Sequence, residues 1–552
     1  MPRRFHLHPL VAVLFGLSAV LLCFGNKAIH IDDPLYVWTA EHIRQKPLDF
    51  YGFEVNWSGK NLPMYQSNYN PPLCAYYLAL VMQLFGSREF TLHAAFCLPT
   101  LMLAAGIYFF AKPFCQRPIV AVLLAVLTPI FLVSATTLMC DVPMLMFWIW
   151  SMVCWDRGLK GNGWLLLIAG LLAGLAILTK YNAILLLPLL ALMAVQHRKR
   201  WPFSLAGLAV PVIILLVYER YTSRLYGEGL FQLSSRASGA KHQALVRDIG
   251  FQAITCLAFL GAGMASISFT ALRAWSWKTV LGVLGATLAI AAVIGVVSED
   301  QAGIQGAGTH LTWPVLLQVA IWSVLGLGVL TTVCLIWLKN RDPINLLFCA
   351  WIGLGLFYST FVNWMLSGRS LLLMVPACAI IFARWLDRSE QNAGAKWRLW
   401  ASLVPAGFLA IWAAQADFSF ANSVRATSRR ICQQLNAENQ RPVWFLGHWG
   451  FQYYMQELGC QPLDLTQPAA NPGDWLVVPY NNVMIFVLPP GVISQNQVIK
   501  THPYWGLAVM QVDASAGFYS SNFGRLPFVF GAIPDDAYYL QKLNQPLRPV
   551  ME

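Results

Sequence analysis

The chain has 552 residues, of which 57% are hydrophobic and only 11% are charged. Soluble proteins carry about 25% charged residues, so this composition, with a mean hydropathy of +0.55, excludes an ordinary soluble domain. It predicts a polytopic α-helical membrane protein. The formal net charge of +12 does not indicate a nucleic-acid partner, because the basic residues gather in short loops between apolar runs, as cytoplasmic loops do.

The first apolar run, Pro9 to Ile29, follows Arg3 and Arg4. It is long enough to cross a bilayer, which takes about 20 residues, and no small-residue cleavage site follows it. We therefore expect an uncleaved first span with a cytoplasmic N-terminus. Twelve further apolar runs bring the expected total to about 13 transmembrane helices; they lie at about 89–111, 118–138, 141–156, 163–180, 181–196, 203–221, 250–272, 278–297, 313–338, 344–364, 370–386 and 398–416.

Every second loop between these runs is basic, and each basic loop falls on the same side as Arg3 and Arg4. This alternation supports the count of spans, and an odd number of spans sends the C-terminal segment to the outer side. Residues 1–417 are then a membrane module with a long outer loop at 30–88. The apolar segment 71–85 in this loop is too short to span, so we expect an interfacial helix there.

Residues 418–552 are expected to form a separate extracytoplasmic domain. Strand-like runs alternate there with helical stretches, which predicts a small mixed α/β fold. Cys432 and Cys460 lie in this domain, in a compartment that permits disulfides; the sequence leaves open whether they pair. The aromatic stretch His448 to Tyr454 has the composition of a sugar-stacking surface, although packing is the favoured interpretation.

Acidic residues follow the first span in His30-Ile31-Asp32-Asp33-Pro34. Acids at a membrane boundary are costly and therefore tend to be functional, but Asp before Pro is also a common helix start. The two interpretations are compatible. Asp141 opens the fourth span, again on the outer side, and has the same two interpretations. Asp32, Asp33 and Asp141 are thus candidate catalytic residues that reach one membrane face.

Several cations are also expected on the outer side, against the positive-inside trend. Lys180 lies at a break between two apolar runs, Arg369 lies at an outer turn, and Arg220 and Arg224 lie in a large outer loop. An anionic ligand such as a phosphate would explain them, although Lys180 could instead snorkel to the lipid headgroups. No histidine spacing matches a metal site and no nucleotide-binding motif is present.

Four stretches carry a resemblance to a known superfamily. These stretches are Asp32-Asp33 followed by Tyr36, Asn70-Pro71-Pro72-Leu73 leading to Tyr76-Tyr77, Asp141-Val142-Pro143, and Gly174-Leu175-Ala176-Ile177-Leu178-Thr179-Lys180. The order of these stretches along the chain, and the side of the membrane on which each is expected, are similar to those of the motifs of the GT-C superfamily. The chain resembles in particular the bacterial membrane glycosyltransferases grouped with dolichyl-phosphate-mannose protein mannosyltransferases and with aminoarabinose lipid A transferases.

The resemblance implies a GT-C fold in the bacterial cytoplasmic (inner) membrane, with a periplasmic C-terminal domain. It implies a polyprenyl-phosphate sugar donor and a lipid, glycan or protein acceptor. Asp32 maps to the essential carboxylate, Asp141 to a supporting acid, and Tyr36, Asn70 and Tyr76 to sugar or acceptor contacts. No cofactor is implied, and the participation of a divalent cation stays open.

Two positions depart from the family pattern. Asn70 stands where the family has Lys, and Leu35 where it often has Arg. Both family residues are associated with the lipid phosphate, so Lys180, Arg369 or a loop arginine would have to replace them, which argues against an aminoarabinose transferase. The alternative function is a transporter or flippase for a lipid-linked or small polar solute, for which inverted repeats and midplane charges would be expected.

Overall fold

The structure is a computed structural model. It describes residues 8–195, 201–245, 249–276, 312–363, 365–389, 395–438, 441–482 and 491–547, with a few isolated positions between 278 and 289 and at 488. Arg3 and Arg4, most of the predicted span at 278–297 and the outer loop after it lie outside the described residues.

Helices account for most of the described chain up to residue 438. They are α1 (Pro9–Cys23), α2 (Asp33–Gln45), α3 (Met64–Ser67), α4 (Leu73–Phe85), α5 (Glu89–Ala111), α6 (Pro118–Val126), α7 (Pro129–Ala135), α8 (Asp141–Lys160), α9 (Trp164–Thr179), the 3-10 helix η1 (Tyr181–Leu185), α10 (Leu186–Val195), α11 (Trp201–Tyr226), α12 (Leu230–Leu245), α13 (Ile249–Gly263), α14 (Ala265–Ala271), the 3-10 helix η3 (Leu272–Ala274), α16 (Trp313–Lys339), α17 (Pro343–Phe357), the π-helix η4 (Tyr358–Val362), α18 (Gly368–Leu372), α19 (Val375–Ser389) and α20 (Ala395–Glu438).

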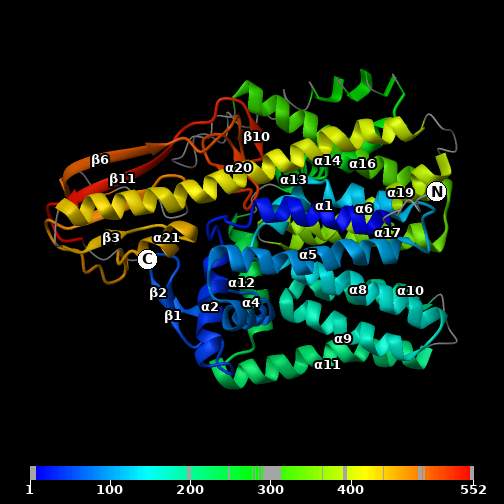
Figure 1. Cartoon of the computed structure of the whole chain (residues 1–552), viewed down its shortest axis with the longest axis horizontal. Helices are drawn as coiled ribbons and strands as arrows, with labels where there is room; N and C mark the ends of the chain where they lie inside the picture. The colour runs from blue at the N-terminus through cyan, green and yellow to red at the C-terminus, as the bar shows by residue number, and fades with distance from the viewer. Residues whose placement is uncertain are drawn as a thin grey trace, which may run out of the picture.

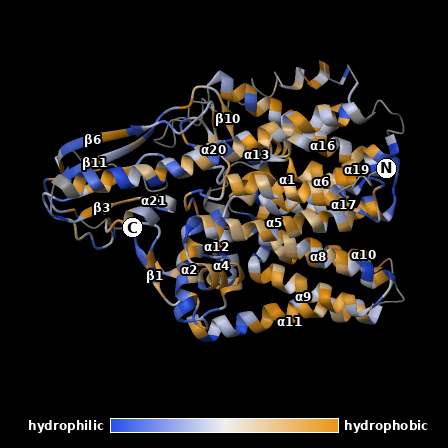
Figure 2. Cartoon of the chain, viewed as in Figure 1, coloured by the Kyte–Doolittle hydropathy of each residue, from blue (hydrophilic) through white to orange (hydrophobic). Residues whose placement is uncertain are grey.

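Five helical segments among the described residues are long and apolar enough to cross a membrane, and two bent helix pairs raise the number to as many as seven. In Figure 2 the helices of this bundle are mostly coloured hydrophobic, whereas the C-terminal part contains more hydrophilic residues. The chain is therefore a multi-pass membrane protein. The predicted total of 13 spans stays a prediction.

Two of the predicted spans are bent instead of straight. The run 118–138 divides into α6 and α7, which meet at 70°, because Pro129 cannot continue the helix and the Thr128 side chain caps the new one by accepting from the N–H of Phe131. The run 250–272 divides into α13 and α14 at 91°. The segment at 71–85 forms the 13-residue helix α4, which is too short to span.

Helix α20 differs most from its predicted form. The sequence predicts a span at 398–416 and a separate outer domain from 418, whereas α20 is one continuous helix of 44 residues. At 1.5 Å per residue it is about 66 Å long, roughly twice a bilayer core. Figure 1 shows it running from the helical bundle along the C-terminal sheet. The boundary between the two parts therefore lies inside a helix.

The C-terminal part contains one helix and nine short strands among its described residues. These are β3 (Val443–Phe445), α21 (Trp449–Glu457), β4 (Gln461–Pro462), β5 (Trp475–Pro479), β6 (Ile493–Thr501), β7 (Leu507–Ala508), β8 (Met510–Gln511), β9 (Ala516–Gly517), β10 (Val529–Phe530) and β11 (Asp536–Leu543). The main sheet has the order β4-β3-β5-β11-β6; β3 is parallel to β4 and β5, and β11 is antiparallel to β5 and β6. A separate hairpin, β1 (Glu54–Asn56) and β2 (Asn61–Pro63), lies in the outer loop.

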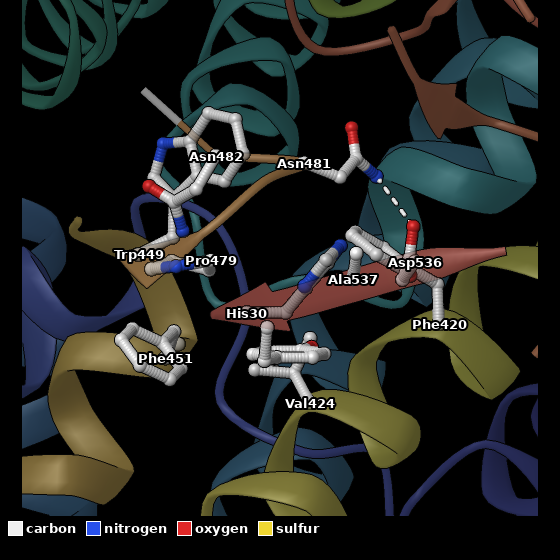
Figure 3. Close-up of a pocket in the computed structure, with 12 residues that line it drawn as sticks. His30, Phe420, Val424, Trp449, Phe451, Pro479, Asn481, Asn482, Asp536 and Ala537 are labelled. Carbon is white, nitrogen blue, oxygen red and sulfur yellow. Dashed lines mark hydrogen bonds between the residues drawn. The ribbon is translucent and has the colours of Figure 1, made fainter. Parts of the chain in front are cut away.

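The C-terminal part packs directly on the end of the bundle. Helix α21 approaches the loop after α1 so closely that a Cβ on Gly450 would lie 2.2 Å from the carbonyl oxygen of Ile29. A small pocket at this joint is lined by His30 and by residues of α20, α21 and β11, and has a volume of about 10 Å³ (Figure 3). That is about the space one water molecule needs, so the two parts meet with little room between them.

Candidate active site

Asp32 lies in the loop between α1 and α2. Ile31, the residue before it, has a φ of +48°, a left-handed conformation that β-branched residues avoid. Such strain costs about 1–3 kcal/mol and persists where the surroundings impose it. Ile31 is 2% exposed, so packing holds this conformation, and it fixes the direction in which the chain presents Asp32.

Asp33 has a different environment from its neighbour. It is fully buried, and its two carboxylate oxygens accept the backbone N–H groups of His30 at 3.1 Å and Leu138 at 2.9 Å. Asp33 therefore ties the Asp32 loop to the segment before α8. Of the two adjacent acids, Asp32 lies beside Arg369, whereas both carboxylate oxygens of Asp33 accept backbone N–H groups.

Asp141 is the first residue of α8 and pairs with Lys180, which lies between α9 and η1. Lys180 Nζ is 2.6 Å from Asp141 Oδ1. The side chain of Asp141 is only 4% exposed, whereas that of Lys180 is 20% exposed. Lys180 thus points inward at a carboxylate instead of snorkelling to the headgroups.

Arg369 joins the two acids. Its Nη2 lies 3.0 Å from Asp32 Oδ2, and its Nη1 lies 3.9 Å from Asp141 Oδ2. Although burial alone would lower the pKa of Arg369, the neighbouring Asp32 and Asp141 carboxylates hold it above its usual value. Asp32, Arg369, Asp141 and Lys180 form a continuous chain of alternating charge, which we call the outer charge cluster. Asp32 is its most accessible member, with 32% of its side chain exposed.

The C-terminal part holds Arg369 in place. The N–H of Gly368 donates to the carbonyl oxygen of Phe518 at 2.7 Å, and the guanidinium of Arg369 lies 5.3 Å from the centre of the Tyr519 ring. The Ser367 and Ser370 side chains cap the start of α18 reciprocally. The position of Arg369 therefore depends on a segment that follows it by 150 residues.

A second group of buried charges adjoins the outer charge cluster and was missed by the sequence analysis. Asp417 on α20 is paired with Lys27 Nζ at 2.5 Å and with His30 Nε2 at 3.2 Å, and it accepts the Tyr519 hydroxyl at 2.8 Å. Lys27 and Asp417 are fully buried. The sequence did contain a signal for this pair: Lys27 follows the first predicted span and Asp417 follows the last, and buried charges in membrane proteins are usually paired.

The aromatic stretch after β3 serves packing, as the sequence analysis favoured. His448 stacks on Trp57 with ring centres 4.7 Å apart, and burial lowers the pKa of His448 to about 4, although Asp32 acts in the opposite direction. The Tyr454 hydroxyl accepts the N–H of Ile29 at 2.8 Å. These side chains support the Asp32 loop from the outer side.

The other predicted contacts are not joined to the cluster. Arg220 and Arg224 lie exposed on α11. Tyr36 is buried and donates its hydroxyl to Sγ of Cys140, the residue before Asp141, at 3.0 Å. Tyr76 donates to the carbonyl oxygen of Pro47, and the carbonyl oxygen of Asn70 accepts the Tyr51 hydroxyl at 2.5 Å. Both residues organise the outer loop.

Metal-binding groups are not gathered in the part of the chain that the structure describes: no three His, Cys, Asp or Glu side chains come together there.

One family model matches the chain. Residues 69–218 match the model of dolichyl-phosphate-mannose-protein mannosyltransferases, a range that includes Asn70, Asp141 and Lys180. This match covers 150 of the 552 residues and confirms the resemblance to GT-C glycosyltransferases. Comparison with curated protein sequences gives no match.

Several solved structures are similar to the chain at low identity. The oligosaccharyltransferase AglB from Archaeoglobus fulgidus, in complex with an inhibitory peptide and a dolichol-phosphate, is 13% identical with a TM-score of 0.48; the match covers 82% of this chain and 64% of that one. ArnT from Cupriavidus metallidurans bound to undecaprenyl phosphate is 13% identical with a TM-score of 0.41, covering 85% and 92%. Arabinosyltransferase EmbB from Mycobacterium smegmatis is 11% identical with a TM-score of 0.35, covering 92% and 47%. The chain thus spans less than two thirds of the archaeal enzyme.

Proposed function

We propose that this chain is an integral membrane glycosyltransferase. It moves a sugar from a polyprenyl-phosphate-linked donor to a lipid, glycan or protein acceptor on the extracytoplasmic face of the bacterial cytoplasmic membrane. The observation that carries the proposal is the bridge that Arg369 makes between Asp32 and Asp141. The accessible carboxylate of Asp32 lies beside Arg369, and Asp141 links Arg369 to a second cation, Lys180; the phosphate of a lipid carrier and an acceptor hydroxyl can meet there.

Arg369 and Lys180 bind the donor phosphate in this mechanism. The guanidinium presents a planar fork of donors that suits phosphate oxygens, and the lysine ammonium adds a second positive charge. When the phosphate takes the Arg369 Nη2 group, Asp32 loses its partner. Donor binding therefore frees the Asp32 carboxylate to accept a hydrogen bond from the acceptor hydroxyl.

Asp32 is the general base. It takes the proton from the acceptor hydroxyl as that oxygen attacks the anomeric carbon, and the bond from this carbon to the phosphate oxygen breaks. Base assistance of this kind contributes about 10²–10⁴-fold, and the fixed charges of Arg369 and Lys180 stabilise the departing phosphate. A single displacement inverts the configuration at the sugar carbon. Asp33 positions the loop and takes no part in proton transfer.

The test is mass spectrometry of lipids and envelope glycans from cells that contain the protein, cells that lack it, and cells complemented with the wild type. The proposal expects that, without the protein, one lipid or glycan species lacks a sugar while a polyprenyl-phosphate sugar accumulates. Loss of a transporter or flippase would instead change where a carrier or solute is found. Acceptors that still receive their sugar carrier would keep their sugar linkages. Unchanged sugar composition in all fractions would contradict transfer.

A further inference from the structure

Two cysteines of the C-terminal part lie unusually close together. The Sγ atoms of Cys432 and Cys460 are 2.8 Å apart, whereas Cys432 Sγ lies 3.6 Å from the sulfur of Met455. Both cysteines are buried, at 2% and 6% exposure. A movement of under about 1 Å would bring the sulfurs to the disulfide bond length of about 2.05 Å.

We propose that Cys432 and Cys460 form a disulfide bond in the mature protein. The inference rests on the proposed function, because it needs the extracytoplasmic location of this domain, where disulfides persist. One S–S bond forms and two S–H bonds break. The two electrons and two protons go to the disulfide of a thiol–disulfide oxidoreductase of that compartment, which is reduced to two thiols by exchange through a mixed disulfide. Because both sulfurs are buried in the folded chain, the bond forms before packing is complete.

The cross-link joins two elements that support the candidate active site. Cys432 lies on the outer half of α20, and Cys460 follows α21 directly. The cysteines are 28 positions apart, and the closed loop contains β3 and α21. Through Tyr454 and Gly450, α21 contacts Ile29 in the loop that presents Asp32. The disulfide therefore fixes the helix that braces this loop to the helix that carries Asp417.

Peptide mapping of the full-length protein tests the bond directly. Free thiols are blocked with iodoacetamide during lysis, and the purified protein is cleaved on the carboxyl side of glutamate without reduction. Cleavage after Glu438 and Glu457 places the two cysteines on different peptides. The proposal expects these peptides to remain joined, two hydrogens lighter than their sum, and to separate on reduction. Both cysteines alkylated before reduction would overturn it.

Thermal unfolding of cysteine variants tests the same bond without the need to recover the two peptides. Cys432→Ala, Cys460→Ala and the double variant should all melt several degrees below the wild type, with the double variant no worse than either single one, because each removes the same bond. Reductant should lower the melting temperature of the wild type to that of the variants and leave the variants unchanged. Cys378→Ala, a buried cysteine on α19, is the control and should retain the response to reductant. Equal melting of wild type with and without reductant would contradict the bond.

This result is separable from the proposed function. If the sulfurs are joined but no sugar is transferred, the disulfide stands and the enzymatic proposal fails. If sugar is transferred but both thiols are free, only the disulfide inference fails.

Discussion

The guanidinium of Arg369 donates to the carboxylate of Asp32 at 3.0 Å, although the two residues are 337 positions apart. This contact joins the loop after the first helix to a turn near the end of the bundle. The same guanidinium reaches toward Asp141, so a single cation holds two acids that come from distant parts of the chain. The role proposed for each member of the outer charge cluster follows from this arrangement.

Replacement of Arg369 by Gln should weaken binding of the lipid phosphate. Loss of a charge-assisted hydrogen bond costs about 1.5–3 kcal/mol, which corresponds to roughly tenfold or more in affinity. The measurement is binding of undecaprenyl phosphate to the protein in lipid nanodiscs, with undecaprenol as the ligand that lacks the phosphate. Arg388→Gln is the matched control, because Arg388 is 46% exposed and pairs with Asp342. Equal affinity of Arg369→Gln and wild type would rule out phosphate binding by this residue.

The pair formed by Asp141 and Lys180 should contribute to stability as well as to binding. Asp141→Asn leaves a partly buried ammonium without its partner, and breaking a buried pair costs up to about 3–5 kcal/mol. The melting temperature in detergent should therefore fall, and the double variant Asp141→Asn/Lys180→Met should recover part of the loss. The exposed pair of Arg236 and Glu228 serves as control, since Arg236→Met should change stability by less than about 1 kcal/mol. A double variant that melts at the sum of the two single losses would show that the residues are not coupled.

Tyr519 contacts both groups of charges, Asp417 through its hydroxyl and Arg369 through its ring, and two substitutions test these contacts separately. Tyr519→Phe removes the hydroxyl that donates to Asp417 but keeps the ring beside Arg369; it should lower stability while undecaprenyl phosphate binding is retained. Tyr519→Leu also removes the ring and should weaken that binding several-fold. Tyr504→Phe removes a hydroxyl that donates to another buried acid, Asp536, at 2.6 Å, and should lower stability alone. If the Leu and Phe variants bind equally, the Tyr519 ring does not position Arg369.

How far the sequence predicted this site can be judged from individual residues. The sidedness of the loops brought Asp32, Asp141, Lys180 and Arg369 to one face before any contact was known. Their pairing could not be predicted, because it depends on helix packing over hundreds of residues. The sequence also could not tell which of two adjacent acids faces outward, since that follows from the Asp33 contacts with the His30 and Leu138 N–H groups.

The fold shows the same division between local and long-range information. Apolar length predicted α5 and α16 nearly to the residue, because each span is determined locally. The bends at α6–α7 and α13–α14 depend on a neighbouring proline or on packing. The continuity of α20 was missed because its apolar inner half and polar outer half have the compositions of two separate helices.

Asp536 in the C-terminal sheet should make stability depend on pH. Burial raises the pKa of Asp536 to about 7, although the Tyr504 and Asn481 hydrogen bonds act in the opposite direction. Its unfolded pKa is about 3.9. Between these values the unfolded chain loses a proton that the folded chain keeps, so the folded state is progressively destabilised as the pH rises toward 7. Below about pH 4 the carboxyl is protonated in both states and no penalty exists.

Asp536→Asn removes this penalty and keeps an oxygen that accepts from Tyr504 and Asn481. We expect the variant to melt above the wild type at pH 8 and close to it at pH 4, as measured by thermal unfolding of the full chain in detergent. Asp535→Asn is the control on an exposed neighbour and should show a smaller difference. An Asp536→Asn variant that is less stable than wild type at pH 8 would show that the carboxylate is ionised and stabilising in the fold.

The central claim is that Asp32 is the base, and the most direct measurement is transfer by Asp32→Asn. The variant removes the proton acceptor but keeps the size of the side chain and an oxygen that can accept from Arg369, so the fold should be retained and undecaprenyl phosphate should bind at least as tightly as to the wild type. Mass spectrometry of lipids and glycans from cells complemented with wild type or variant should show restoration by the wild type only, with the rate of transfer by the variant lowered at least about 10²-fold. Wild-type turnover by a correctly folded Asp32→Asn protein would contradict the account.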